Sequence, residues 1–295
     1  GTYFPSENLP VTIQLVTATR SPTTDYPGTI GLRFNFINGG TSGLMSNVKI
    51  RKAISYSIDR EEMIDAVYGR YNPAYSYVAP AITFNGSSYR SQVGEVIEDE
   101  YNEYVGDPDK IVALFQEGLD ELGVETPIED ITLTYLTSGS TTEVQAEREY
   151  IQQSLEETLG LTVELSVAGD TSLFIADRNE GNYDFFLGGW YSDYNDPLDF
   201  LYTNYTDSYG MSFGGYSNPD YDALADQLVG ETDMDKRLDI YKQMEQILLL
   251  DDCAFAPIYY ATKQVLLQNW VKDYRTSYFG ASAEFIWTYI DGKNQ

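Results

Sequence analysis

The sequence of 295 residues contains no histidine, one cysteine and only 18 basic residues against 46 acidic ones. The absence of histidine excludes Ser-His-Asp and Cys-His nucleophiles, histidine-ligated zinc and histidine general bases. Cys253 begins an apolar run, so we expect a small buried side chain there and not a nucleophile. No stretch is long and apolar enough to predict a membrane span. We therefore expect neither a catalytic thiol nor a bound metal or cofactor.

The net charge limits the kinds of molecule that the chain is expected to bind. A net charge of −28 repels phosphate backbones and anionic lipid headgroups, which argues against nucleic-acid binding and peripheral membrane docking. A large net charge also keeps a protein soluble. It does not argue against a cationic or zwitterionic ligand. We expect a monomer.

Helical and strand patterns alternate along the middle of the chain. Strand patterns occupy 29–37, 131–136, 161–167 and 183–187, and helical patterns start at Val48 and occupy 107–122, 141–159 and 171–179. Residues 70–106 show no strong period, so we expect a long ordered loop there. Because helical crossovers join parallel strands, the alternation predicts an α/β fold with a mixed, mainly parallel sheet flanked by helices.

Several helix boundaries carry capping residues. Asp59 precedes an apolar pattern and is followed by Glu62, which forms the sequence of a capping box. Asp107 and Pro108 predict a helix start, and Gly123 predicts its end. The apolar positions of that helix are Ile111, Leu114, Phe115, Leu119 and Leu122.

The segment after the strand at 183–187 concentrates polar and aromatic residues. In open α/β sheets, ligands bind beyond the carboxyl ends of the strands. Two glycines at 188 and 189 permit close backbone approach or a positive φ. Large aromatic residues then stand beside two carboxylates: Trp190, Tyr191, Asp193, Tyr194 and Asp196. Aromatic rings provide apolar walls and a partly buried carboxylate binds a cationic group, so this segment is the first candidate ligand site.

Other interpretations of the same segment stay open. It is also typical of an acidic loop whose aromatic residues belong to the core. Paired carboxylates are used by glycoside hydrolases, which makes an enzyme of that class a distant alternative. A calcium loop is disfavoured, because Leu198 stands where such a loop needs glycine and Asn204 stands where it needs an acid.

Five ordered motifs resemble the dipeptide and oligopeptide solute-binding proteins of ABC importers, known as solute-binding protein family 5. GWYSDYNDP at 189–197 is similar to the family signature Gly-Trp-x-x-Asp-Tyr-x-x-Pro. NVKIRKAISYSIDR at 47–60, preceded by LRFN at 32–35, resembles the family's Asn-Val-x-Val-Arg helix and the strand before it. The other three matches are PAYSYVAP at 73–80, NPDYD at 218–222 and APIYY at 256–260.

The resemblance implies a periplasmic-binding-protein-like fold in which two lobes enclose a peptide. It implies that Asp193 receives the peptide's α-ammonium and that the protein is not an enzyme. It also implies an extracellular or periplasmic location, a lipoprotein anchor in the full-length protein, and a membrane permease as partner. An oligosaccharide or another small solute is the alternative ligand. The candidate ligand-binding residues are Gly189, Trp190, Tyr191, Asp193, Tyr194, Asn195 and Arg178.

Arg178 is a candidate because oligopeptide binders have an arginine near the ligand at the matching position; it is equally typical of a solvated charge at a helix end. The chain also departs from the family. Leu187 stands where some relatives have an arginine for a short peptide's carboxylate, and Thr171 stands where some have tryptophan. A preference for peptide length therefore does not carry over.

The resemblance also implies a domain organisation. Residues 41–252 would form the second, ligand-binding lobe. Residues 1–40 would be strands that belong to or link to a first lobe, and residues 253–295 would be hinge strands that return to it. The chain begins with Gly-Thr-Tyr, and we expect the bulk of the first lobe to lie outside it.

Overall fold

The computed structural model describes residues 18–20, 23–206, 208, 213–280 and 283–292. The chain divides into a larger compact unit, Asp25–Lys263, and a smaller one made of Gly1–Thr24 and Gln264–Gln295. Within the described residues, no helix is both long enough and apolar enough to cross a lipid bilayer.

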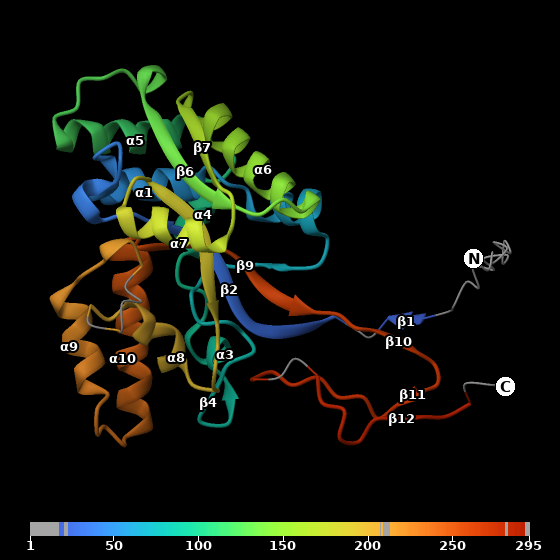
Figure 1. Ribbon diagram of the computed structural model, residues 1–295. Helices are drawn as coiled ribbons and strands as arrows, with labels where there is room; N and C mark the ends of the chain where they lie inside the picture. The colour runs from blue at the N-terminus through green and yellow to red at the C-terminus, as the bar shows by residue number, and fades with distance from the viewer. Residues whose placement is uncertain (1–17, 21–22, 207, 209–212, 281–282, 293–295) are drawn as a thin grey trace, which may run out of the picture. The chain divides into compact units, whose positions relative to one another are not determined.

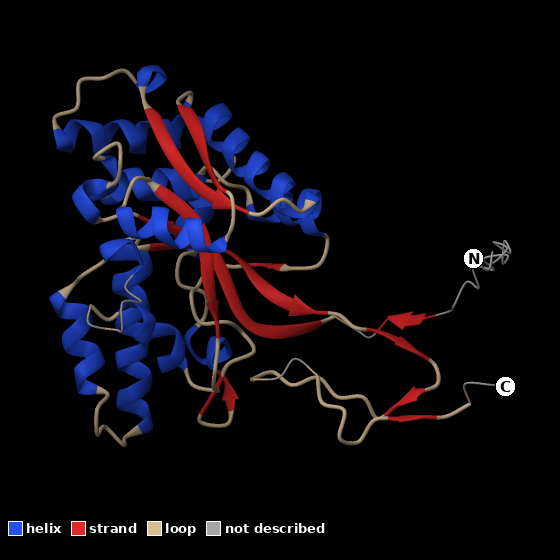
Figure 2. Ribbon diagram, viewed as in Figure 1, coloured by secondary structure: helices blue, strands red, loops and turns tan. Residues whose placement is uncertain are grey.

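A mixed sheet with flanking helices forms the larger unit (Figure 2). Its strands among the described residues are, in spatial order, β3 (Asn72–Pro73), β9 (Phe255–Lys263), β2 (Thr24–Phe34), β8 (Phe185–Tyr191), β6 (Thr132–Ser138) and β7 (Thr162–Ala168). Strand β6 pairs in parallel with β7 and β8, whereas β8 pairs antiparallel with β2, and β3 antiparallel with β9. The expected mixed α/β sheet is confirmed, although these pairs are parallel only at its β8–β6–β7 edge. Helix α6 connects the parallel neighbours β6 and β7, whereas α7 leads from β7 past β6 to β8.

Helices lie on both sides of this sheet (Figure 1). They are α1 (Val48–Tyr56), α2 (Arg60–Met63), α3 (Tyr89–Val93), α4 (Glu98–Tyr104), α5 (Pro108–Leu122), α6 (Thr142–Leu159), α7 (Thr171–Glu180), α8 (Pro197–Leu201), α9 (Pro219–Gln227) and α10 (Met234–Gln246). The predicted caps form: the side chains of Asp59 and Asp107 accept from the backbone N–H groups of Glu62 and Lys110. Gly123 ends α5 in the left-handed conformation that glycine allows.

A large hydrophobic core joins helices to the sheet. Ile50 and Ile54 of α1, and Phe115 and Leu119 of α5, are fully buried in it, as their helical spacing predicts. Leu122 is 38% exposed, so the predicted apolar stripe of α5 ends one turn earlier than expected.

Residues 70–106 differ from the loop that we expected, because α3 and α4 lie within them with the short strands β4 (Thr83–Phe84) and β5 (Ser87–Ser88). These helices are too short to show a period in the sequence, and tertiary contacts hold them. Arg90 of α3 pairs with the buried Glu245 of α10, and the Tyr101 hydroxyl of α4 donates to the Ile58 carbonyl.

Several of the family-like motifs meet inside the larger unit. The side chain of Arg60 is fully buried. Its Nε donates to the Pro257 carbonyl at 2.7 Å and to the Ala74 carbonyl at 3.2 Å, and its Nη2 donates to Ser55 Oγ at 3.0 Å. One guanidinium therefore ties the helix at 47–60 to the segments at 73–80 and 256–260.

Cys253 is buried, as predicted. Burial raises the pKa of its thiol to about 11, so the thiol is protonated and unreactive at neutral pH.

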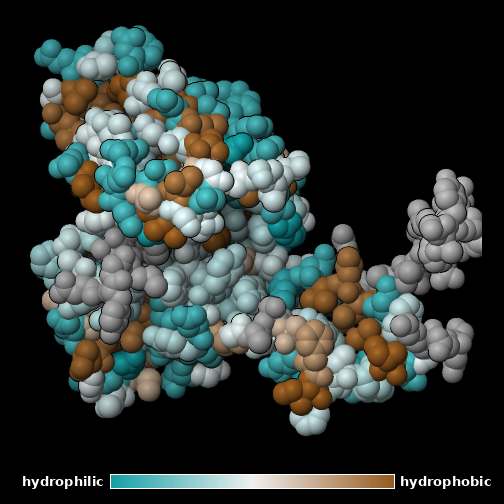
Figure 3. Space-filling view, in the orientation of Figure 1, coloured by the Kyte–Doolittle hydropathy of each residue, from teal (hydrophilic) through white to brown (hydrophobic). Residues whose placement is uncertain are grey.

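The smaller unit consists, among its described residues, of short antiparallel pairs. Strand β1 (Ala18–Arg20) pairs with β10 (Leu266–Gln268), and β11 (Val271–Lys272) pairs with β12 (Tyr289–Ile290). Its large apolar side chains are mostly exposed, including Phe285, Ile286 and Trp287. In Figure 3 brown, hydrophobic atoms are prominent over this unit. The assignment of 1–40 and 253–295 to a first lobe or a hinge stays a prediction.

Candidate functional site

The signature segment begins inside a strand, because β8 continues through both glycines to Tyr191. This differs from the strand end at 187 that we expected. Neither glycine has a positive φ. At Gly189, which lies opposite Ile30 of β2, a Cβ atom would stand 1.9 Å from the Thr29 carbonyl oxygen. Glycine is therefore required here by the close approach of the neighbouring backbone, which is one of the two reasons considered from the sequence.

A cavity of about 310 Å³ opens at the end of β8. Among the described residues it is lined by Trp190, Asp193, Tyr194, Asp199, Tyr202, Thr203 and Ser208. The last four come from α8, from the 3₁₀ turn Tyr202–Asn204 and from the segment that follows. The cavity thus combines aromatic walls with two carboxylates, which suits a ligand that carries a cationic group beside apolar parts.

Asp193 lines this cavity, but it is exposed and not partly buried as expected, because it lies in the turn between β8 and α8. The ion pairs found within the described residues do not include its carboxylate. Burial, followed by the negative charges of Asp199, Asp196 and Asp193, raises the pKa of the neighbouring Tyr194. The cavity wall therefore carries carboxylate acceptors, which are the groups that hydrogen-bond to cations.

Asp199 holds the wall of the cavity together. It is only 7% exposed, and its Oδ2 accepts from Trp190 Nε1 and from the backbone N–H of Asp193, both at 2.8 Å. Asp199 is not among the candidate ligand-binding residues that the sequence suggested. The signal that could have placed it is Asp196-Pro197, a helix start that puts residues 199, 202 and 203 on one face.

Other predicted site residues lie elsewhere. Successive side chains of a strand point to opposite faces, so Tyr191 does not share the cavity of Trp190. Its ring packs over Gly28 and against Tyr26, at a centroid distance of 5.9 Å. Gly189 contributes backbone to the sheet. Arg178 lies near the end of α7, with Nη2 3.5 Å from Asn179 Oδ1, and does not line the cavity described above.

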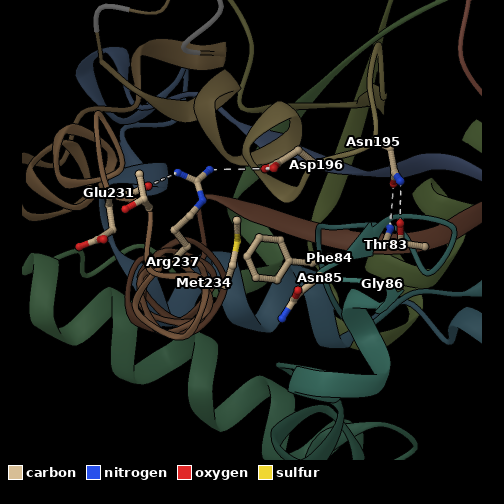
Figure 4. Close-up of a pocket in the computed structure, with 10 residues that line it drawn as sticks. Thr83, Phe84, Asn85, Gly86, Asn195, Asp196, Glu231, Met234 and Arg237 are labelled. Atoms are coloured by element: carbon tan, nitrogen blue, oxygen red, sulfur yellow. Dashed lines mark hydrogen bonds and ion pairs between the residues drawn. The ribbon is translucent and has the colours of Figure 1, made fainter.

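Asn195 lies on a second cavity, of about 500 Å³ (Figure 4). Its Oδ1 accepts from the Thr83 N–H at 2.8 Å and its Nδ2 donates to Thr83 Oγ1 at 2.6 Å. The described lining also includes Phe84, Asp196, Met234 and Arg237. Asn195 therefore joins the signature loop to the hairpin β4–β5, and its predicted contact with a ligand stays a prediction.

Known proteins share this sequence and this fold. A sequence profile described as "Bacterial extracellular solute-binding proteins, family 5 Middle" matches residues 5–212. The oligopeptide-binding protein OppA of Bacillus subtilis is 30% identical over 234 residues, which cover 78% of this chain and 39% of that protein. The dipeptide-binding protein DppE of the same organism is 30% identical over 225 residues, covering 76% and 39%.

A solved structure agrees with these relatives. The chain is similar to Listeria monocytogenes OppA bound to peptide, with a TM-score of 0.74 and 30% identity, over 92% of this chain and 50% of that one. The chain spans about half that structure and less than half of the two curated relatives. It belongs to family 5 of the bacterial extracellular solute-binding proteins.

Proposed function

We propose that this chain forms the peptide-binding wall of an extracytoplasmic solute-binding protein, which delivers peptides to the permease of an ABC importer. Hinge closure of two lobes would enclose the ligand. The observation that carries the proposal is the cavity at the end of β8, where Asp193 lies beside Trp190 and Tyr194. The names of the relatives, oligopeptide-binding and dipeptide-binding proteins, support the same class of ligand.

In this proposal Asp193 receives the α-ammonium of the peptide. Within the described residues this carboxylate takes part in no ion pair. It would gain a charge-assisted hydrogen bond from the incoming amine, and the aromatic side chains would shield that contact from water. Asp193 is exposed in this chain, so the full shielding would require a second wall from the remainder of the protein.

The test compares peptides with free and acetylated amino termini, measured by calorimetry on the natural full-length protein. Acetylation should weaken binding by about 2 kcal/mol or more, because it removes the ammonium that Asp193 would bind. In Asp193→Asn the two peptides should bind with nearly equal affinity. Asp239→Ala, on the exposed face of α10, serves as the matched control. Equal affinities in the unsubstituted protein would reject the role of Asp193.

An oligosaccharide is the second candidate ligand, and the aromatic walls favour it. Trp190, Tyr194 and Tyr202 line one cavity, and sugar rings stack on such faces. A ligand that binds only the native state raises the melting temperature, so a thermal-shift panel of peptides against oligosaccharides separates the two classes.

We propose that the chain is part of a binding protein and not of an enzyme. Asp193 and Asp199 do line the same cavity, which is the kind of carboxylate pair that a glycoside hydrolase needs. However, one oxygen of Asp199 already accepts two hydrogen bonds from the cavity wall. That use argues for a structural role, and hydrolysis of a bound oligosaccharide would contradict the proposal.

A further inference from the structure

Asp199 is a buried carboxylate on which two parts of the site converge. The indole N–H of Trp190 and the backbone N–H of Asp193 both donate to its Oδ2 at 2.8 Å. Hydrogen bonds to an ionised acceptor are roughly twice as strong as neutral ones. A single oxygen thus sets the orientation of one cavity wall and the path of the backbone that carries Asp193.

The neighbouring structure holds Asp199 in place. Its backbone N–H donates to the Asp196 carbonyl at 3.1 Å, and the Asp196 side chain caps α8 by accepting from the Leu198 N–H at 2.8 Å. Asp196 Oδ1 also accepts from the Tyr241 hydroxyl of α10 at 2.8 Å. The N-terminus of the short helix α8 is therefore hydrogen-bonded to α10. This contact limits the movement of Asp199, to which the loop is bonded.

We propose that Asp199 is a positioning residue, which holds the Trp190 indole against the cavity and fixes the loop so that the Asp193 carboxylate meets the ligand. The effect on ligand binding rests on the function proposed above. The effect on the loop does not, because both hydrogen bonds lie within this chain.

The loop is tested first, on this chain without ligand. Trp270 and Trp287 are replaced by phenylalanine so that the tryptophan fluorescence comes from Trp190 alone. Asp199→Ala should shift the Trp190 emission and speed hydrogen exchange of the Asp193 amide. Asp199→Asn should restore both, since its Oδ1 can still accept the two hydrogen bonds. Asp239→Ala, a control on the exposed face of α10, should change neither.

Unchanged emission and exchange in Asp199→Ala would overturn the positioning role. If that variant does not fold, hydrogen exchange of the unsubstituted chain still tests the proposal. The Asp193 amide must then be protected from exchange, although its residue is exposed. An unprotected amide overturns the inference as well.

The ligand effect is tested second, on the natural full-length protein with a free-amine peptide and its acetylated form. Asp199→Ala should weaken binding of the free-amine peptide about tenfold or more, and Asp199→Asn within about threefold. The preference for the free amine should shrink in Asp199→Ala and persist in Asp199→Asn. A full preference in Asp199→Ala contradicts the inference. If the unsubstituted protein shows no preference, the proposed function fails, whereas the loop measurements still decide the role of Asp199.

Discussion

Two regions of the larger unit use charged side chains in opposite ways. In the buried framework, which we define as Arg60, Glu245 and their partners, the charged groups form hydrogen bonds or ion pairs inside the protein. In the signature loop, residues 190–199, the Asp193 carboxylate is exposed and takes part in no ion pair within the described residues. Family-like motifs therefore serve two purposes: some build the scaffold, and one presents a charge to the outside. Substitutions in the first should change stability, and substitutions in the second should change binding.

The largest effect should follow from Glu245→Ala. Glu245 is fully buried, pairs with Arg90 and accepts from the Val78 N–H at 3.0 Å. Its removal leaves a buried guanidinium without its counter-charge, and we expect a loss of about 3–5 kcal/mol in the free energy of unfolding. Urea denaturation measures it. Glu117→Ala, which removes an exposed partner of Lys49, is the control and should leave the midpoint nearly unchanged. A small change in the free energy of unfolding for both variants would contradict the prediction that buried ion pairs stabilise this fold more than surface ion pairs do.

Gly189→Ala tests the close approach of β8 to β2, just before the signature loop. The new Cβ would meet the Thr29 carbonyl at 1.9 Å, and a backbone atom in a paired strand cannot move aside. We expect a loss of about 3 kcal/mol. Gly169→Ala is the matched control, because its Cβ would meet only the tip of Leu173 at 3.4 Å. Thermal unfolding of both variants gives the comparison, and equal melting temperatures would contradict the close packing of β8 on β2.

Glu147 of α6 should make stability depend on pH. Burial raises the pKa of its carboxyl to about 7 from 4.5, partly offset by a hydrogen bond from Tyr68. The folded state therefore binds a proton that the unfolded state does not, and this contribution to stability grows as pH falls from 7 to 5. The free energy of unfolding relative to Glu147→Gln should rise by about 2 kcal/mol over that range. Urea titrations at several pH values measure the difference, and a flat or falling difference would contradict the shift.

The smallest effect is expected from Asn195→Ala. The variant loses both hydrogen bonds to Thr83, at an exposed site where water can replace them. We expect a loss of about 1 kcal/mol or less in stability, with faster hydrogen exchange in the hairpin β4–β5. Peptide affinity separates two roles for this residue. A loss of affinity as large as that of Asp193→Asn would place Asn195 at the ligand and not only at the hairpin.

Local patterns predicted much of the fold. The caps at Asp59 and Asp107 and the apolar face of α5 depend on residues close together in the chain, so their spacing is sufficient. Helices α3 and α4 were missed because distant residues hold them, as Glu245 holds Arg90. The strand end at 187 was also wrong, since two glycines can mark either a turn or a close contact with a neighbouring strand.

The candidate site was predicted only in part, for a related reason. The signature segment and Asp193 were found from composition and motif, and the structure brings Trp190, Asp193 and Tyr194 to one cavity. The strand pleat separates Tyr191 from it, and Asn195 is bonded to a hairpin more than 100 residues away in sequence. Asp199 had a local signal in the helix start at Asp196-Pro197, but its role requires the fold of the loop.

Residue type and short-range spacing were enough to predict the class of fold, the boundaries of several helices, the absence of histidine chemistry and the resemblance to a family. The folded structure shows which polar side chains are hydrogen-bonded inside the protein and which stay exposed, as Arg60 and Asp193 illustrate. This difference depends on hydrogen bonds between residues far apart in the chain, such as Arg60 to the Pro257 carbonyl. Spacing along a sequence does not encode such contacts.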